Sequence, residues 1–275
     1  MPGTPSNISF TTCEQKIHSG PQTEKMKKLD VLLSPAELPG LASRNLQDTV
    51  CVVFDVLRAT STFVTALYHG AKAIFPVSEI SEALEFRETD PGILLAGERD
   101  GVKIRARPNG DVDFDLGNSP REFTPETIGG KVVVSTTTNG TRALRACAGA
   151  QTILAASFLN LTATAGFIRQ CASTEILLIC AGTGSRIADE DVIAAGALAE
   201  LLSDEKLVPS PSALTAVAAW QKSKSNLAAA IARAENARRL LALPGLADDV
   251  AFCLQVDRFP IIARMSAGAL VSGSR

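Results

Sequence analysis

The sequence holds few histidines, few large aromatic side chains and no paired cysteine motif. Among its 275 residues only two are histidine, one is Trp and one is Tyr. His18 lies in a polar N-terminal stretch and His69 directly precedes a glycine, so we expect neither a Ser-His or Cys-His triad nor a zinc site with several histidines. The six cysteines are scattered without a C-x-x-C pair. This usage predicts buried free thiols and a reducing cytoplasm rather than a disulfide framework.

The sequence also lacks an excess of basic charge and a long hydrophobic run. It has 27 basic and 29 acidic residues, for a formal net charge of -2. With so little basic charge and so few aromatic rings for base stacking, nucleic acid is not an expected partner. No segment reaches about 18 uninterrupted apolar residues, and the N-terminus lacks a signal-peptide pattern. We therefore expect neither a membrane span nor secretion, and a cytoplasmic location.

The chain divides into three parts by pattern. Residues 1–25 are rich in Ser, Thr, Pro and Gln without periodicity, which predicts a disordered leader. In residues 26–206 short β-branched runs alternate with amphipathic or Ala-rich stretches, which predicts an α/β catalytic core with a mostly parallel sheet and flanking helices. After Leu207 the strands are expected to stop, so residues 207–275 are predicted to form a helical region packed on the core. Its Ala-rich helices could form a subunit interface, which leaves a homo-oligomer as an open prediction.

Polar side chains follow four of the expected strands. Since ligands bind outside the carboxyl ends of parallel strands, we expect these side chains to meet at one edge of the sheet. They are Asp55, Arg58 and Ser61 after residues 50–54, Glu98 and Arg99 after residues 92–96, Thr138, Asn139 and Arg142 after residues 132–135, and Arg186, Glu190 and Asp191 after residues 175–180.

Each of these segments also has an ordinary structural explanation. Asp and Ser after a strand often cap a helix, Thr-Asn-Gly is a common turn, and an acidic triplet such as 189–191 complements a helix dipole. However, Arg58, Arg99 and Arg142 follow three different strands, and unpaired guanidinium groups in one cleft would repel each other. Their convergence would therefore indicate an anionic ligand. The acidic residues at the same edge are oxygen ligands of the kind that Mg²⁺ prefers.

Other phosphate-binding motifs are missing. Gly182 and Gly184 lack the third glycine of a dinucleotide-binding fingerprint, because Ile187 stands in its place, and no G-x-x-x-x-G-K-[ST] occurs. Asp55 is followed two positions later by Leu57, so the D-x-D signature of haloacid-dehalogenase-type phosphatases is absent.

The remaining motifs together resemble the 2-phosphosulfolactate phosphatase (ComB) family. The resemblance runs from about Lys27 to Pro260, with a longer leader and an insertion at residues 105–113. It implies a Mg²⁺-dependent acid phosphatase that hydrolyses (R)-2-phospho-3-sulfolactate to 3-sulfolactate and phosphate, a step of coenzyme M biosynthesis. The matching segments are Asp55-x-Leu57-Arg58-Ala59-Thr60-Ser61, Gly97-Glu98-Arg99, residues 114–120 with Asn118 and Ser119, Thr136 to Ala143, and Ala181-Gly182-Thr183 with Glu190-Asp191.

The resemblance suggests a role for each residue toward a small anionic phospho-acid substrate. Several arginines suit a substrate with phosphate, sulfonate and carboxylate groups, because planar guanidinium forks pair with such groups bidentately. The candidate catalytic residues are Asp55, Arg58, Arg142 and Asp191; the candidate substrate-binding residues are Arg99, Ser61, Asn118, Ser119, Thr138, Asn139 and Arg186; and the candidate Mg²⁺ ligands are Asp55 and Asp191, followed by Glu190 and Glu98.

Two alternatives stay open at this point. Hydrolysis could pass through a phosphorylated Asp55 or through direct attack by metal-bound water, and the missing second Asp favours direct attack. A non-catalytic binder of small organic phosphates or sulfonates would keep the arginines without needing paired acidic metal ligands.

Overall fold

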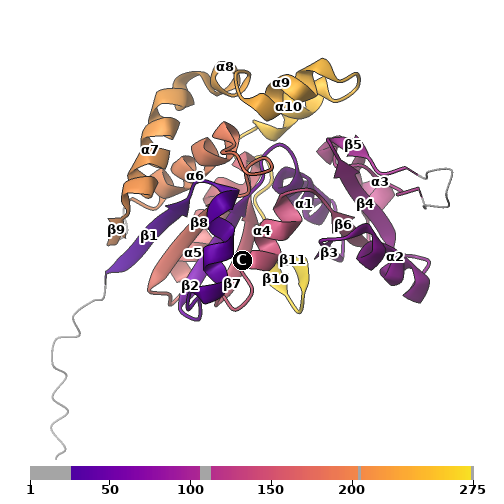
Figure 1. Cartoon of the computed structure of the whole chain (residues 1–275), viewed down its shortest axis with the longest axis horizontal. Coiled ribbons are helices and arrows are strands. Elements are labelled where there is room, and N and C mark those ends of the chain that lie inside the picture. Colours follow the sequence, from indigo (N-terminus) through magenta and orange to yellow (C-terminus); the bar gives the residue numbers. More distant parts are fainter. Residues whose placement is uncertain (1–25, 106–112, 204–205, 274–275) are drawn as a thin grey trace, which may run out of the picture.

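The computed structural model describes residues 26–105, 113–203 and 206–273. The expected leader and most of the expected insertion lie outside these residues. The described strands form one sheet in the order β5-β4-β6-β3-β11-β10-β7-β2-β8-β1-β9, with helices on both faces (Figure 1). The predicted α/β class with a mostly parallel sheet is confirmed.

The strands and helices alternate along most of the chain. The strands are β1 (Lys27–Leu32), β2 (Thr49–Phe54), β3 (Ala73–Val77), β4 (Leu94–Arg99), β5 (Val102–Lys103), β6 (Val132–Thr136), β7 (Thr152–Ala156), β8 (Glu175–Cys180), β9 (Leu207–Pro209), β10 (Ile262–Ser266) and β11 (Ala269–Gly273). The α-helices are α1 (Ala59–Tyr68), α2 (Ile80–Thr89), α3 (Pro125–Ile128), α4 (Gly140–Ala146), α5 (Leu161–Gln170), α6 (Asp189–Leu201), α7 (Pro211–Ser223), α8 (Leu227–Ile231), α9 (Glu235–Ala242) and α10 (Ala247–Cys253). Four 3-10 helices are η1 (Pro35–Ser43), η2 (Pro120–Glu122), η3 (Phe158–Asn160) and η4 (Lys224–Asn226).

The C-terminal hairpin β10–β11 joins two groups of parallel strands. One group is β4, β6 and β3, and the other is β7, β2, β8, β1 and β9. The hairpin lies between them and pairs antiparallel with β7 on one side and β3 on the other. The expectation that strands stop after Leu207 is therefore wrong, because β9 extends one edge and this hairpin fills the middle of the sheet.

The two parallel groups run in opposite directions across the sheet, since three successive pairings between them are antiparallel. In a flat sheet their carboxyl ends would lie at opposite edges. Neighbouring strands are rotated by about 20–25°, so the five steps from β2 to β6 accumulate roughly 100–125° of rotation. Residues at the carboxyl ends of strands from both groups nevertheless line one cavity.

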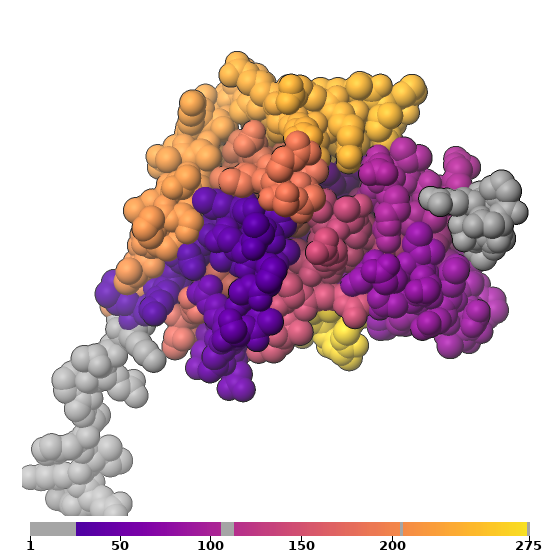
Figure 2. Space-filling view, viewed as in Figure 1, coloured from indigo at the N-terminus to yellow at the C-terminus, as the bar shows by residue number. Residues whose placement is uncertain are grey.

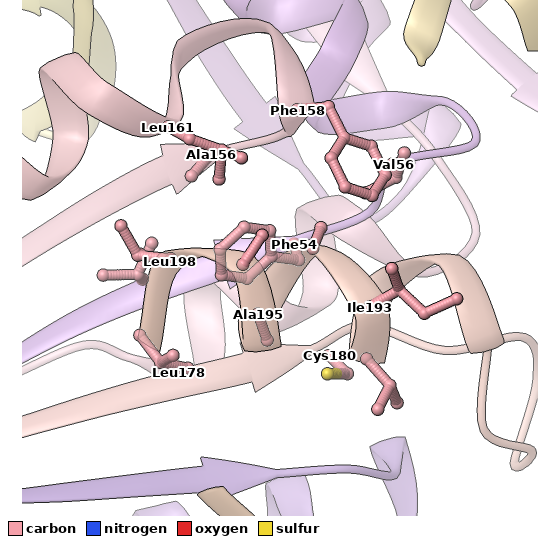
Figure 3. Packing of buried hydrophobic residues seen from close by; sticks show 14 of the residues in the cluster. Phe54, Val56, Ala156, Phe158, Leu161, Leu178, Cys180, Ile193, Ala195 and Leu198 are labelled. Atoms are coloured by element: carbon pink, nitrogen blue, oxygen red, sulfur yellow. The ribbon is translucent and has the colours of Figure 1, made fainter. Parts of the chain in front are cut away.

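Strand β2 shows why the sheet is covered on both faces. All six of its residues are buried, and successive side chains of a strand point to opposite faces. Val50, Val52 and Phe54 accordingly pack in one core cluster, whereas Cys51 and Val53 pack in another. Figure 3 shows the first cluster, in which Phe54 faces the Ala-rich helix α6.

Residues 211–253 form the expected helical region, from α7 to α10. Figure 1 and the space-filling view in Figure 2 show these helices as an orange and yellow band that extends from β9 toward β4 and β5. None of the helices in the described ranges is both long and apolar enough to cross a membrane. The division between core and helical region, and the oligomeric state, stay predictions.

Helices α6 and α7 approach each other closely at Gly196. A β-carbon at this position would lie 1.9 Å from the carbonyl oxygen of Ala216. We therefore expect Gly196→Ala to lower the free energy of unfolding by about 1–3 kcal/mol, because the helices must move apart. Gly166→Ala in α5 is the matched control, since nothing lies within 4 Å of its β-carbon position. The control should raise stability by roughly 0.5–1 kcal/mol in urea unfolding, and equal effects of the two variants would refute the packing argument.

Candidate active site

A polar cavity of about 430 Å³ opens where the two groups of strands meet. Its volume suits a small ligand. Residues after β2, β4, β6 and β8 line it, together with residues of α9, so the expected convergence of strand ends is borne out for part of the set. The lining consists of Asp55, Leu57, Arg58, Glu98, Asp100, Gly101, Asn118, Thr138, Asn139, Thr183, Gly184, Ser185, Arg186, Asn236, Arg239 and Leu240.

Asp55 is the buried carboxylate of the cavity wall. Its Oδ1 accepts the backbone N–H of Ala59 at 3.1 Å, which ties it to the start of α1. A β-carbon at position 140 would lie 2.8 Å from Asp55 Oδ2, so only glycine allows the loop after β6 to approach so closely. Burial, together with the nearby charges of Glu98 and Glu190, raises the pKa of Asp55 to about 7 against the opposing effect of the backbone donors.

Glu98 connects two loops at the cavity. Its Oε1 accepts from the backbone N–H and the hydroxyl of Thr138, at 3.0 and 3.1 Å, and its Oε2 accepts from the N–H of Gly101 at 2.7 Å. The loop after β6 and the turn between β4 and β5 are therefore held by one carboxylate.

Glu190 and Asp191 lie behind Asp55 at the start of α6, and both are almost fully buried. Asp191 accepts backbone N–H groups from Val56 at 2.8 Å and Gly182 at 3.0 Å, so it joins the loops after β2 and β8 rather than capping its own helix. Glu190 Oε1 accepts from Asn236 at 2.7 Å, whereas its buried Oε2 has no partner in the described part of the chain. Burial raises the pKa of both carboxyl groups, and for Asp191 the charges of Glu190 and Asp55 add to this effect.

The chemistry of this acidic group fits a divalent cation. A buried carboxylate oxygen without a partner is costly unless it is protonated or neutralised. In residues 26–105, 113–203 and 206–273, no three His, Cys, Asp or Glu side chains form a complete metal-binding group. A Mg²⁺ site does not require three such side chains, because Mg²⁺ keeps several waters and takes one or two protein carboxylates together with substrate phosphate.

Arg58 is held by a residue from the other end of the chain. Its Nη1 lies 2.7 Å from Asp249 Oδ2 of α10, and its Nη2 donates to the carbonyl of Gly101 at 2.7 Å. Asp249 Oδ1 also accepts from the hydroxyl of Ser119 at 2.7 Å. The side chains of Arg58 and Asp249 are 3% and 0% exposed, so helix α10 fixes the guanidinium at the cavity wall.

The expected convergence of Arg58, Arg99 and Arg142 is wrong. Arg99 donates to the carbonyl of Glu98 and to the hydroxyl of Thr136, away from the cavity lining. Consecutive residues of a strand point to opposite faces, so Glu98 and Arg99 cannot both face the cavity. Arg142 is exposed and lines a separate cavity of about 180 Å³, which shares Asn139, Gly184 and Ser185 with the main one.

Of the candidate residues with hydroxyl or amide side chains, some line the cavity and others do not. Asn118, Thr138 and Asn139 line the cavity, as predicted. Ser61 does not, because its hydroxyl donates to the carbonyl of Val56 at 2.8 Å within the first turn of α1. Ser119 likewise contacts Asp249 instead of the cavity. Arg186 lines the cavity and forms an exposed ion pair with Glu235 at 2.7 Å.

The pattern of strand ends did not predict the contribution of α9 and α10. Asn236 and Arg239 line the cavity, and Asp249 anchors Arg58. A usable signal was present, since residues four apart share a helix face and Asn236 lies four residues before the buried Leu240. A polar side chain on the apolar face of an amphipathic helix indicates a buried polar contact.

Comparisons with known proteins show which family the chain resembles. A model of the 2-phosphosulpholactate phosphatase family matches residues 35–268. A relative from Caldanaerobacter subterraneus subsp. tengcongensis is 38% identical over 231 residues, covering 82% of this chain and 91% of its own. One from Thermotoga petrophila is 38% identical over 244 residues, covering 88% and 97%. One from a Synechococcus strain is 34% identical over 227 residues, covering 81% and 91%. All three are named "Probable 2-phosphosulfolactate phosphatase".

An α/β protein with an acidic and arginine-lined cavity at its strand ends is of the class that binds small anions. The chain belongs to the 2-phosphosulpholactate phosphatase family, whose members are phosphoric monoester hydrolases.

The buried Arg58–Asp249 pair gives a test of stability. Asp249→Ala leaves the guanidinium buried without its carboxylate, so we expect a loss of about 3–5 kcal/mol in the free energy of unfolding. The adjacent Asp248 is the matched control, because its side chain is 78% exposed although it pairs with Arg121 at 3.2 Å. Asp248→Ala should change stability by less than about 1 kcal/mol. Similar losses for the two variants in chemical denaturation would contradict the assigned burial.

The raised pKa of Asp55 gives a test against pH. Its carboxyl ionises more readily in the unfolded chain than in the fold, so ionisation favours unfolding between the ordinary value of 3.8 and about 7. With a chelator present, the melting temperature should therefore fall as pH rises through this window. Asp55→Asn should flatten this dependence in calorimetric melts. A melting temperature that rises across the window to the same extent in both proteins would contradict the assignment.

Proposed function

We propose that this protein is a Mg²⁺-dependent phosphatase that hydrolyses 2-phospho-3-sulfolactate, or a similar small phospho-acid, to 3-sulfolactate and phosphate. The observation that carries the proposal is the cavity itself, which places buried carboxylates beside Arg58, Arg186 and Arg239. Carboxylates that raise each other's pKa favour a bound cation, and arginines favour an anionic ligand. The names of the relatives supply the substrate class.

In this proposal Asp55 and Glu190 hold Mg²⁺, with Glu98 beside them. Asp55 lines the cavity, and Glu190 has the carboxylate oxygen that lacks a partner among the described side chains. Asp191, expected from the sequence to be a ligand, is assigned a positioning role because both of its oxygens accept backbone N–H groups. When bound, the cation neutralises charge on the transferring phosphoryl group.

The residues of the chain then bind and align the substrate. In this proposal water attacks phosphorus directly and the P–O bond to the sulfolactate oxygen breaks, because the Asp55 carboxylate, held by N–H groups of Ala59 and Gly140, is assigned to the cation rather than to an acyl phosphate. Phosphoryl transfer depends mainly on alignment and on stabilisation of charge. Arg58 supplies a fixed positive charge, and the buried Asn118 offers amide groups to the substrate at the cavity wall.

The proposal extends to the cellular setting. The cysteines in the described ranges are free and mostly buried, which supports action in a reducing cytoplasm. The reaction would serve coenzyme M synthesis in a cell that makes this cofactor.

The direct test is phosphate release from 2-phospho-3-sulfolactate across a Mg²⁺ titration. The parent protein should release phosphate only with the cation, and Asp55→Asn should reduce turnover by roughly 10²- to 10⁴-fold. Glu190→Gln should raise the Mg²⁺ concentration needed for half-maximal rate. Asp48→Asn is the control, because Asp48 is exposed and lies outside the cavity.

Two outcomes would count against the proposal. Full activity in the presence of EDTA would remove the metal from the mechanism. Binding of the phospho-acid without any phosphate release would favour the non-catalytic binder.

A further inference from the structure

The three arginines of the main cavity differ in how their charges are paired. Arg58 is neutralised by Asp249, and Arg186 forms its ion pair with Glu235. Arg239 lines the same cavity, but its guanidinium has no hydrogen bond or ion pair with any residue of the described ranges. It is therefore the one cavity-lining guanidinium in these ranges whose donors are all free for a ligand.

Helix α9 holds Arg239 at this place. Leu240 is buried beside it, and Asn236 on the same helix donates to Glu190 and to Thr183, both at 2.7 Å. The guanidinium lies against the turn after β4, where a β-carbon at Gly101 would lie 3.3 Å from Arg239 Nη2. Gly101 has a φ of +79°, and its lack of a side chain leaves room for this approach.

The same turn connects Arg239 to the rest of the site. Gly101 donates its N–H to Glu98 Oε2 and accepts from Arg58 Nη2 through its carbonyl. The acidic side of the cavity, the paired Arg58 and the unpaired Arg239 thus all lie around one residue. An anion bound at Arg239 would contact the cavity wall without displacing an existing ion pair.

We propose that Arg239 binds an anionic group of the substrate other than its phosphate and so determines specificity for multiply charged phospho-acids. The inference rests on the proposed function. A guanidinium fork matches a sulfonate or carboxylate bidentately, and an arginine that already has a carboxylate partner would have to lose it to do the same. The carboxylates around Asp55 would meanwhile hold the phosphate through the cation.

The test compares variants against substrates that lose their anions one at a time. The substrates are 2-phospho-3-sulfolactate, 2-phospholactate, which lacks the sulfonate, and phenyl phosphate, which has neither extra anion. For Arg239→Ala we expect kcat/KM to fall about 10- to 100-fold on 2-phospho-3-sulfolactate and to stay unchanged on phenyl phosphate. Arg239→Lys should restore part of the loss. Arg238→Ala is the matched control, because the neighbouring Arg238 is exposed and does not line the cavity.

A loss confined to 2-phospho-3-sulfolactate identifies the sulfonate as the bound group, and a loss on 2-phospholactate as well identifies the carboxylate. Equal effects of Arg239→Ala on all three substrates, or none, overturn the inference. Calorimetric binding of 3-sulfolactate separates it from the proposed function. Weaker binding by Arg239→Ala than by Arg238→Ala, in a protein that releases no phosphate, supports Arg239 while overturning the phosphatase. No binding of 3-sulfolactate by the parent protein overturns the role of Arg239.

Discussion

The pairing of the hairpin β10–β11 with both groups of parallel strands is the constraint on which the cavity depends. The hairpin inverts the strand direction between β7 and β3, and residues at the carboxyl ends of both groups line one cavity. Asp55 comes from one group and Glu98 from the other. The charge of Glu98 raises the pKa of Asp55 because the two side chains lie close together in this geometry.

The charged side chains at the cavity differ in whether an opposite charge lies beside them. Arg58 and Asp249 form an ion pair that is almost completely excluded from water. The pair fixes the position of the Arg58 guanidinium, and removing both charges from water costs desolvation free energy. The carboxylates of Asp55, Glu190 and Asp191 have no comparable cationic partner among the described residues, and burial raises the pKa of each. A site with a rigid arginine on one side and unneutralised acids on the other is suited to a ligand that brings both a cation and anionic groups.

Local patterns were enough to predict most of the strands before residue 181 and most of the helices, because each depends on residues close together in sequence. The hairpin β10–β11 was missed since its turn is Ala267-Gly268, and an alanine with a φ of +47° gives no turn signal. The expected strand ended at residue 96, whereas β4 continues to Arg99, so the alternation that turns Arg99 away from the side of Glu98 was not predicted. Asp249 could not be assigned to Arg58, since no local rule connects residues 191 positions apart.

The order of synthesis has a particular bearing on this fold. The hairpin that sets the spacing of the two strand groups, and the helices that supply Asn236, Arg239 and Asp249, all come from the last part of the described chain. A nascent chain can form the parallel strand groups and still lack the walls of the cavity. The capacity to bind a ligand therefore arises late, after most of the hydrophobic core has been translated. Until β10 and β11 leave the ribosome, the sheet lacks the two central strands that connect β7 to β3.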